Sequence, residues 1–165
     1  MGLSVTISAA AERDAEHILK LQYLCYQSEA ELYGDWSIEP LTQSLDALSA
    51  ELDEGHGLVA RLGDEVVASV RARLDEDGTV RIAKLIVHPR MRRHGLGGRL
   101  LDAIEDHFAG GVEQLPAPSA KRFRLFTGHR SEGNLRLYRS RGYAQVGVHE
   151  VGPRVTLVTL EKAAA

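Results

Sequence analysis

The segment Val87–Gly98, with the sequence VHPRMRRHGLGG, combines residue types that bind a phosphate group. Glycine has no side chain to hold an anion away from backbone N–H groups, and the start of a helix adds partial positive charge. Arginine and histidine side chains supply further hydrogen-bond donors. The segment therefore predicts a pyrophosphate site. The alternative is a tight turn before a helix, with arginines that only face solvent.

This segment matches neither of the two commonest phosphate-binding loops. A P-loop needs a lysine followed by serine or threonine, and the segment contains no lysine. Leu100 occupies the last glycine position of the dinucleotide-binding fingerprint. A different pyrophosphate ligand is therefore expected.

A second candidate segment, Ser131–Tyr143, lies downstream. Tyr138 falls within a helical pattern there, and a phenol hydroxyl can give a proton to a leaving group. The alternative is a core tyrosine on an amphipathic helix. Tyr138 is therefore the best candidate for a catalytic side chain.

The apolar periodicity predicts the strands and helices that position these segments. The predicted strands are Leu3–Ser8, Gly57–Leu62, Val66–Leu74, Val80–Val87, Arg122–Thr127, Tyr143–Val151 and Arg154–Glu161, and the predicted helices are Ala11–Leu32, Leu41–Leu52, Gly97–Phe108 and Glu132–Ser140. Ser37 and Thr42 are candidate caps of the second helix, and Ala109–Ala120 is expected to be a loop.

The order β-α-α-β-β-β-α-β-α-β-β predicts an α/β (α+β) fold with one mixed sheet. Three antiparallel strands form a meander, and a strand–helix–strand crossover then places Val80–Val87 parallel to Arg122–Thr127. Ligands favour the carboxyl ends of such strands, which both candidate segments follow.

The composition limits the classes of protein. With 165 residues, the chain is expected to form one domain, residues 1–165. A net charge of −3 argues against a nucleic-acid partner. No apolar run approaches the roughly 20 residues that span a bilayer, and no signal pattern is present, so a soluble cytoplasmic protein without a membrane partner is expected. The single cysteine, Cys25, is expected to pack in the core.

The run Val87-His88-Pro89 followed by Arg92-x-x-Gly95-x-Gly97-Gly98 resembles motif A of the GNAT superfamily of N-acetyltransferases, which binds the pyrophosphate of coenzyme A. The resemblance implies the GNAT fold, acetyl-CoA as cosubstrate, no metal, and transfer of an acetyl group to a primary amine. It also implies cofactor-binding residues: the main chain of Leu85, Ile86 and Val87 for the pantetheine arm and acyl carbonyl, and Arg92, Arg93, His94, Gly95, Leu96, Gly97 and Gly98 for the phosphates.

The segment Ser131–Tyr143 resembles motif B of the same family, which implies that Tyr138 is the general acid toward the coenzyme A thiolate. Family members commonly have asparagine seven residues before that tyrosine, where this chain has Ser131. Ser131 is expected to cap the helix and to reach the cofactor. Asn134, one helical turn before Tyr138, is the alternative contact or faces solvent.

The general base does not follow from the resemblance. Many family members carry a glutamate in the fourth strand, but Val80–Val87 contains no carboxylate. The candidate bases are His88, His129, Glu29, Glu31, Asp35 and Glu39. The same acidic segment, together with Tyr33 and Trp36, is a candidate wall for a cationic amine. A polyamine, an aminoglycoside, an amino acid and a protein N-terminus all stay open as acceptors.

Three further alternatives concern activity, and one concerns assembly. One is transfer of a longer acyl group, the second a non-catalytic acyl-CoA sensor or structural module, and the third a nucleotide-binding regulator. A homodimer is also considered, because the terminal strand Arg154–Glu161 is expected to offer a free edge.

Overall fold

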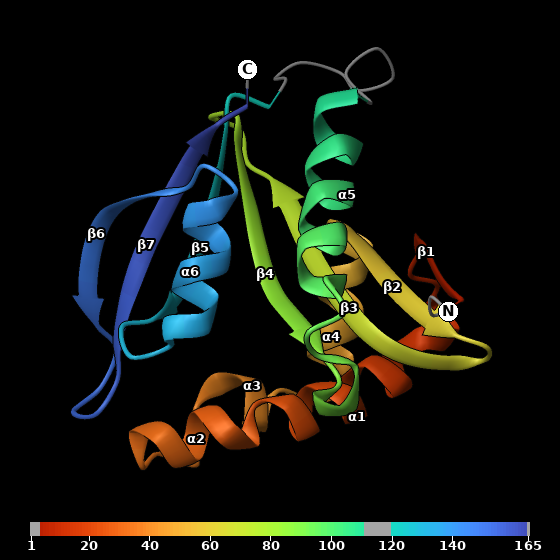
Figure 1. Ribbon diagram of the computed structural model, residues 1–165, viewed down its shortest axis with the longest axis horizontal. Coiled ribbons are helices and arrows are strands. Elements are labelled where there is room, and N and C mark those ends of the chain that lie inside the picture. Colours follow the sequence, from red (N-terminus) through yellow and green to blue (C-terminus); the bar gives the residue numbers. More distant parts are fainter. Residues whose placement is uncertain (1–3, 111–119, 165) are drawn as a thin grey trace.

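The computed structural model describes residues 4–110 and 120–164 of the chain. One seven-stranded sheet with the order β1-β2-β3-β4-β5-β7-β6 forms its centre (Figure 1). The strands are β1 (Val5–Ala9), β2 (His56–Leu62), β3 (Glu65–Leu74), β4 (Thr79–Val87), β5 (Arg122–Gly128), β6 (Ala144–Glu150) and β7 (Thr156–Ala163). Only β4 and β5 pair in parallel, so the sheet is mixed as predicted.

Helices cover both faces of the sheet (Figure 1). They are α1 (Ala15–Cys25), α2 (Gln27–Tyr33), α3 (Glu39–Thr42), α4 (Leu45–Glu54), α5 (Leu96–Gly110) and α6 (Glu132–Ser140), with short 3-10 turns η1 (Glu12–Asp14) and η2 (Pro89–Met91). On one face, α5 and α6 bury Leu100, Ile104 and Tyr138 in a large apolar cluster. On the other face, α1 and α4 bury Ile18 and Leu48 in a second cluster. None of the described helices is both long enough and apolar enough to cross a membrane.

The parallel strands β4 and β5 separate after a short stretch of pairing. Only residues Thr79–Arg81 of β4 pair with β5, whereas β5 pairs with β7 along its whole length. β4 also carries a bulge, because the register with β3 shifts and Lys84 has a left-handed φ of 55°. A bulge bends its strand and re-aims the side chains around it. Both irregularities lie at the carboxyl half of β4, where ligands were predicted to bind.

The predicted single helix Ala11–Leu32 is wrong. The chain forms η1, α1 and α2 instead. α1 ends at Cys25, and the next residue, Tyr26, caps it with an N–H that donates to the Gln22 carbonyl. The periodicity of apolar residues continues through this break, because α1 and α2 each bury a face. Spacing alone cannot report the irregular residue Tyr26 between the two helices.

The predicted helix Leu41–Leu52 is also two helices, α3 and α4, separated by the extended residue Gln43. Ser37 and Thr42 are not its caps, since their hydroxyls bond to Asp35 and to the Glu39 carbonyl. The cap of α4 is Ser44, whose hydroxyl accepts from the Ala47 N–H at 3.1 Å.

The other predicted elements occur with ends shifted by a few residues, and α6 has the predicted bounds. Two further corrections remain. Ala109 and Gly110 belong to α5 rather than to the predicted loop, whose residues 111–119 lie outside the described part. The expected free edge at Arg154–Glu161 is wrong, because β7 lies between β5 and β6.

Candidate functional site

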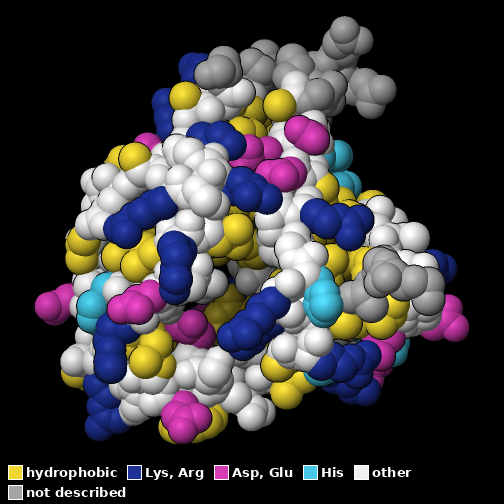
Figure 2. Space-filling model, in the orientation of Figure 1, with side chains coloured by type: hydrophobic (Ala, Val, Ile, Leu, Met, Phe, Trp, Pro, Cys, Tyr) yellow, Lys and Arg dark blue, Asp and Glu magenta, His cyan; other side chains and the backbone are white. Residues whose placement is uncertain are grey.

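Two cavities meet at the carboxyl half of β4. We call the first the glycine-loop cavity; it measures about 890 Å³ and is lined by the loop before α5, the end of β4 and one side of α6. The second, the inter-strand cavity, measures about 680 Å³ and lies between the separated parts of β4 and β5. The residues that line both are Tyr26, Glu29, Leu85 and Asn134. Figure 2 shows a hollow near the middle of this face, with Lys and Arg side chains beside it.

The structure gathers nearly all predicted cofactor residues around the glycine-loop cavity. Those that line it are Leu85, Ile86, Val87, Arg92, Arg93, Gly95, Leu96, Gly97, Gly98, Ser131 and Asn134. His94 does not line the cavity and is exposed. Residues from β4, the loop and α6 therefore converge on one space, although the chain separates the first from the last by about fifty positions.

The structure gives different reasons for glycine at each of the three loop positions. Gly95 has a left-handed φ of 75°, and a Cβ atom there would meet nothing within 4 Å. A Cβ atom at Gly97 would approach the Leu137 side chain at 3.3 Å, and one at Gly98 would lie 2.1 Å from Arg141 Nη2. Gly95 therefore leaves open space in front of the loop backbone, whereas the other two glycines allow α5 to pack against α6 and the residue after it.

The edge of β4 that faces β5 has no sheet partner beyond Arg81 within the described residues. Leu85 lies on this stretch and lines both cavities. Unpaired strand backbone offers N–H and C=O groups to a ligand that lies along it. The separation of the two strands thus leaves this stretch of β4, to which the resemblance assigned the pantetheine arm, without a strand partner on the side of β5.

Cys25 packs in the second apolar cluster, as predicted. Its thiol donates to the Val87 carbonyl with Sγ at 3.4 Å. Burial raises the pKa of this thiol to about 11, although the Arg92 side chain opposes that shift. The thiol is therefore protonated at neutral pH, which argues against a nucleophilic role.

Tyr138 is 5% exposed and lines the inter-strand cavity from α6. Burial raises the pKa of its hydroxyl, and the negative charge of Glu29 raises it further. Within the described residues, no protein group hydrogen-bonds that hydroxyl. Tyr138 therefore keeps its proton at neutral pH and can offer it to a ligand.

A hydrogen-bonded chain connects α6 to α2 beside Tyr138. The Ser131 hydroxyl donates to the Glu29 carboxylate at 2.8 Å, and the Tyr33 hydroxyl lies 3.2 Å from the Ser131 hydroxyl. The backbone N–H of Arg130 donates to the Tyr33 hydroxyl at 2.9 Å. Ser131 is therefore not a side-chain cap of α6, contrary to prediction, because its hydroxyl is directed to Glu29.

The structure separates the six candidate bases. Glu29 lines both cavities, whereas Asp35 and Glu39 line only the inter-strand cavity. The remaining three, Glu31, His88 and His129, line neither. Of the two aromatic residues expected in an acceptor wall, Tyr33 lines the inter-strand cavity and Trp36 does not.

Sequence reasoning missed two residues of this region. Tyr26 lies where α1 ends and α2 begins, and it lines both cavities. Burial and the neighbouring Tyr138 raise the pKa of its hydroxyl. Lys84 lines the inter-strand cavity from the bulge of β4. The apolar spacing contains no signal for either, since one depends on a helix break and the other on a bulge.

Comparison with known proteins identifies the family to which this architecture corresponds. The family model of the Acetyltransferase (GNAT) family matches residues 16–143. Mycothiol acetyltransferase of Amycolatopsis mediterranei (strain U-32) is 35% identical over 95 residues, which are 54% of this chain and 31% of that protein. The chain thus spans less than a third of that relative's length.

Solved structures share the fold at low identity. The ribosomal-protein-S18-alanine N-acetyltransferase from Escherichia coli superposes with a TM-score of 0.77 at 13% identity, over 98% of this chain and 94% of that one. A putative acetyltransferase from Salmonella typhimurium, solved with acetyl-CoA, superposes with a TM-score of 0.74 at 18% identity, over 98% and 95% of the two chains. These likenesses confirm the predicted fold. Because the family match covers more than half of the chain, the protein belongs to the Acetyltransferase (GNAT) family.

Proposed function

We propose that this protein transfers an acetyl group from acetyl-CoA to a primary amine, with Tyr138 as the proton donor to the departing sulfur. The observation that carries the proposal is the meeting of the two cavities at Glu29 and Leu85, beside Tyr138. One cavity suits the donor and the other the acceptor, and a transfer reaction requires that the two touch. Membership of the GNAT family supports the acetyl donor, as does the mycothiol acetyltransferase relative.

The glycine-loop cavity is the donor site in this proposal. The start of α5 and the backbone N–H groups of residues 93–98 would bind the pyrophosphate, because the helix dipole and these donors both favour an anion. Gly95, which has open space before it, fits that role. Arg92 lines the same cavity and adds a charged donor. The pantetheine arm would lie along Leu85–Val87.

In the proposed reaction, a named group gives or accepts each proton that moves. Acetyl-CoA supplies the acetyl group as a thioester. Glu29 accepts a proton from the bound ammonium group, which frees the nitrogen lone pair. The nitrogen then bonds to the acetyl carbon as the carbon–sulfur bond breaks. The sulfur takes a proton from Tyr138, and the surplus proton of the nitrogen returns to Tyr138 through solvent. Glu29 releases its proton to solvent, so the products are the amide, the free thiol and one proton.

The test combines free-thiol release with calorimetry of acetyl-CoA binding. Tyr138→Phe is expected to lower kcat about 10²-fold, because general acid catalysis typically contributes that much, while the Kd of acetyl-CoA stays within about twofold. Tyr143→Phe is the control, since that buried hydroxyl donates to Glu105 and lines neither cavity. Acetyl-CoA binding without transfer to any amine would contradict the proposal and favour a sensor.

A further inference from the structure

The walls of the inter-strand cavity differ in chemistry from one side to the other. Carboxylates come from α2 and the segment after it: Glu29, Asp35 and Glu39. Apolar residues come from β5, from the turn between β6 and β7 and from the start of β7: Leu125, Phe126, Val151, Val155 and Leu157. Ser37 donates two hydrogen bonds to Asp35, which lower the pKa of that carboxyl and keep it charged. The cavity therefore offers an anionic side and an apolar side.

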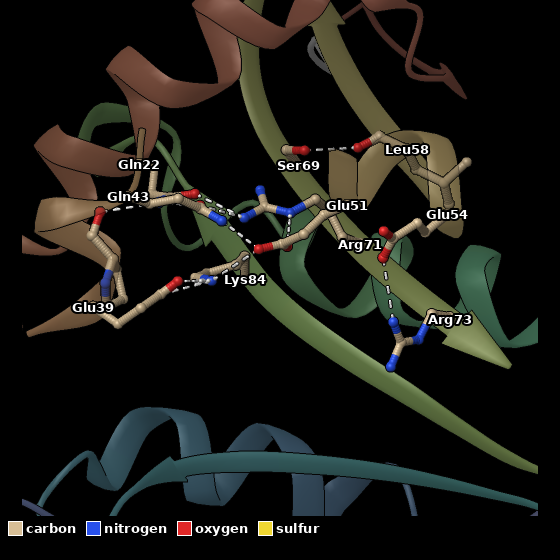
Figure 3. Close-up of polar contacts among 11 residues, drawn as sticks. Gln22, Glu39, Gln43, Glu51, Glu54, Leu58, Ser69, Arg71, Arg73 and Lys84 are labelled. Carbon is tan, nitrogen blue, oxygen red and sulfur yellow. Dashed lines mark hydrogen bonds and ion pairs between the residues drawn. The ribbon is translucent and has the colours of Figure 1, made fainter. Parts of the chain in front are cut away.

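Lys84 is the only cation that lines this cavity among the described residues, and its charge is already neutralised. Its ammonium group lies 3.0 Å from Glu39 Oε2 and 4.0 Å from Glu51 Oε1, and its side chain is 12% exposed (Figure 3). Glu51 in turn accepts from Arg71 Nε at 2.8 Å. Glu39 lines the cavity itself, whereas Glu51 belongs to a network behind the cavity wall. Because Lys84 is paired with both, the described residues that line the cavity offer no unpaired cation to an incoming ligand.

From this arrangement we infer that the acceptor is a small primary amine with a single cation on an uncharged, apolar body, and that amines with a carboxylate are excluded. The inference rests on the proposed function and names its substrate class. The ammonium group would face Glu29, and the apolar body would lie against Phe126, Val151 and Leu157. A carboxylate on the acceptor would meet the carboxylates of Glu29 and Asp35, which form no ion pair with the described residues, and like charges placed together cost binding energy.

The size of the cavity argues against a large acceptor such as a peptide, and its apolar side argues against a diamine. A volume of about 680 Å³ is within the range of small-molecule sites, which are mostly apolar with a few polar groups. A second ammonium group at the far end of the acceptor would lie on the apolar side, where it loses its hydration without gaining a partner. A diamine should therefore be a poorer acceptor than a monoamine of equal length.

The test is a matched panel of acceptors with the full chain and saturating acetyl-CoA. Phenylethylamine should exceed phenylalanine in kcat/KM by at least about tenfold, and phenylalaninamide, which is branched but uncharged at that position, should fall between them. The kcat/KM for hexylamine should likewise exceed that for 1,6-diaminohexane. Equal or better use of phenylalanine or of the diamine overturns the inference, as does better use of a peptide N-terminus than of these small amines.

A variant tests the role of Lys84 in this selectivity. Glu39→Gln removes one of the two partners of Lys84. The kcat/KM for phenylethylamine divided by the kcat/KM for phenylalanine should then fall by about threefold or more. Glu54→Gln is the control, because Glu54 pairs with Arg73 outside the cavity. An unchanged ratio in Glu39→Gln overturns the inference. Failure of the proposed function is distinguishable, since it appears as no transfer to any acceptor rather than as transfer with a different preference.

Discussion

The Ser131 hydroxyl donates a 2.8 Å hydrogen bond to the carboxylate of Glu29, which joins the start of α6 to α2. Ser131 stands where the family commonly has asparagine, and its hydroxyl bonds to Glu29 rather than to the helix. We call the region where the two cavities meet the junction; the residues that line both cavities there are Tyr26, Glu29, Leu85 and Asn134. Because Glu29 lines both cavities, this bond sets the orientation of the carboxylate nearest to the proposed reaction. Ser131 is therefore a positioning residue in the proposed mechanism.

Glu29→Gln should lower kcat by about 10²-fold, because the amide cannot accept the amine proton. Ser131→Ala should lower kcat by about threefold to tenfold and leave the Kd of acetyl-CoA unchanged. In the double variant the losses should not add, since both act through one carboxylate. Steady-state kinetics and calorimetry measure both quantities, with Glu31→Gln as the control on the same helix. Additive losses would mean that Ser131 does not act through Glu29.

Tyr26→Phe tests which phenol gives the proton. Tyr26 and Tyr138 both lie beside the junction, and the described residues offer neither hydroxyl a hydrogen bond. If Tyr138 is the donor, Tyr26→Phe should lower kcat by less than about tenfold, well below the loss in Tyr138→Phe. Thiol-release kinetics on both variants decide the matter. A larger loss of kcat in Tyr26→Phe than in Tyr138→Phe would mean that Tyr26 is the proton donor.

Gly128→Ala should disturb the junction from a distance. A Cβ atom at this position would lie 2.0 Å from the Tyr33 hydroxyl, which contacts Ser131. Overpacking of this kind typically costs about 1–3 kcal/mol of unfolding free energy, and displacement of Tyr33 should also lower kcat. Urea denaturation and kinetics measure the two effects. Gly147→Ala on β6 is the control, since its Cβ atom would meet Thr159 at an ordinary 3.9 Å, and it should change neither quantity.

The buried tyrosines predict a loss of stability in alkali. Burial raises the pKa of Tyr138, whereas an unfolded tyrosine ionises near about pH 10. Below that pH both states keep the proton, and above it the unfolded state releases the proton first, so the free energy of unfolding falls as pH rises. Tyr138→Phe should weaken this fall between about pH 9 and 11. Urea denaturation at several pH values checks it, and an identical slope in the variant would show that Tyr138 does not contribute.

Local sequence patterns predicted much of the fold and the residues that gather around the glycine-loop cavity. The strands of the meander and helix α6 depend on apolar alternation and helical spacing, which are properties of neighbouring residues. The loop before α5 depends on glycine and arginine at close spacing, and the structure places almost all of its predicted residues around one cavity. These elements and this grouping were predictable because each depends on residues close together in the chain.

Only the tertiary structure decided which residues surround the inter-strand cavity. Tyr26 reaches the junction because α1 breaks there, Glu29 because α2 lies against α6, and Lys84 because β4 bulges. Each position depends on contacts between segments far apart in sequence, which apolar periodicity does not encode. The sequence by itself therefore determined the family and the expected donor, whereas the separation of β4 from β5 decided where a second cavity opens and which charges surround it.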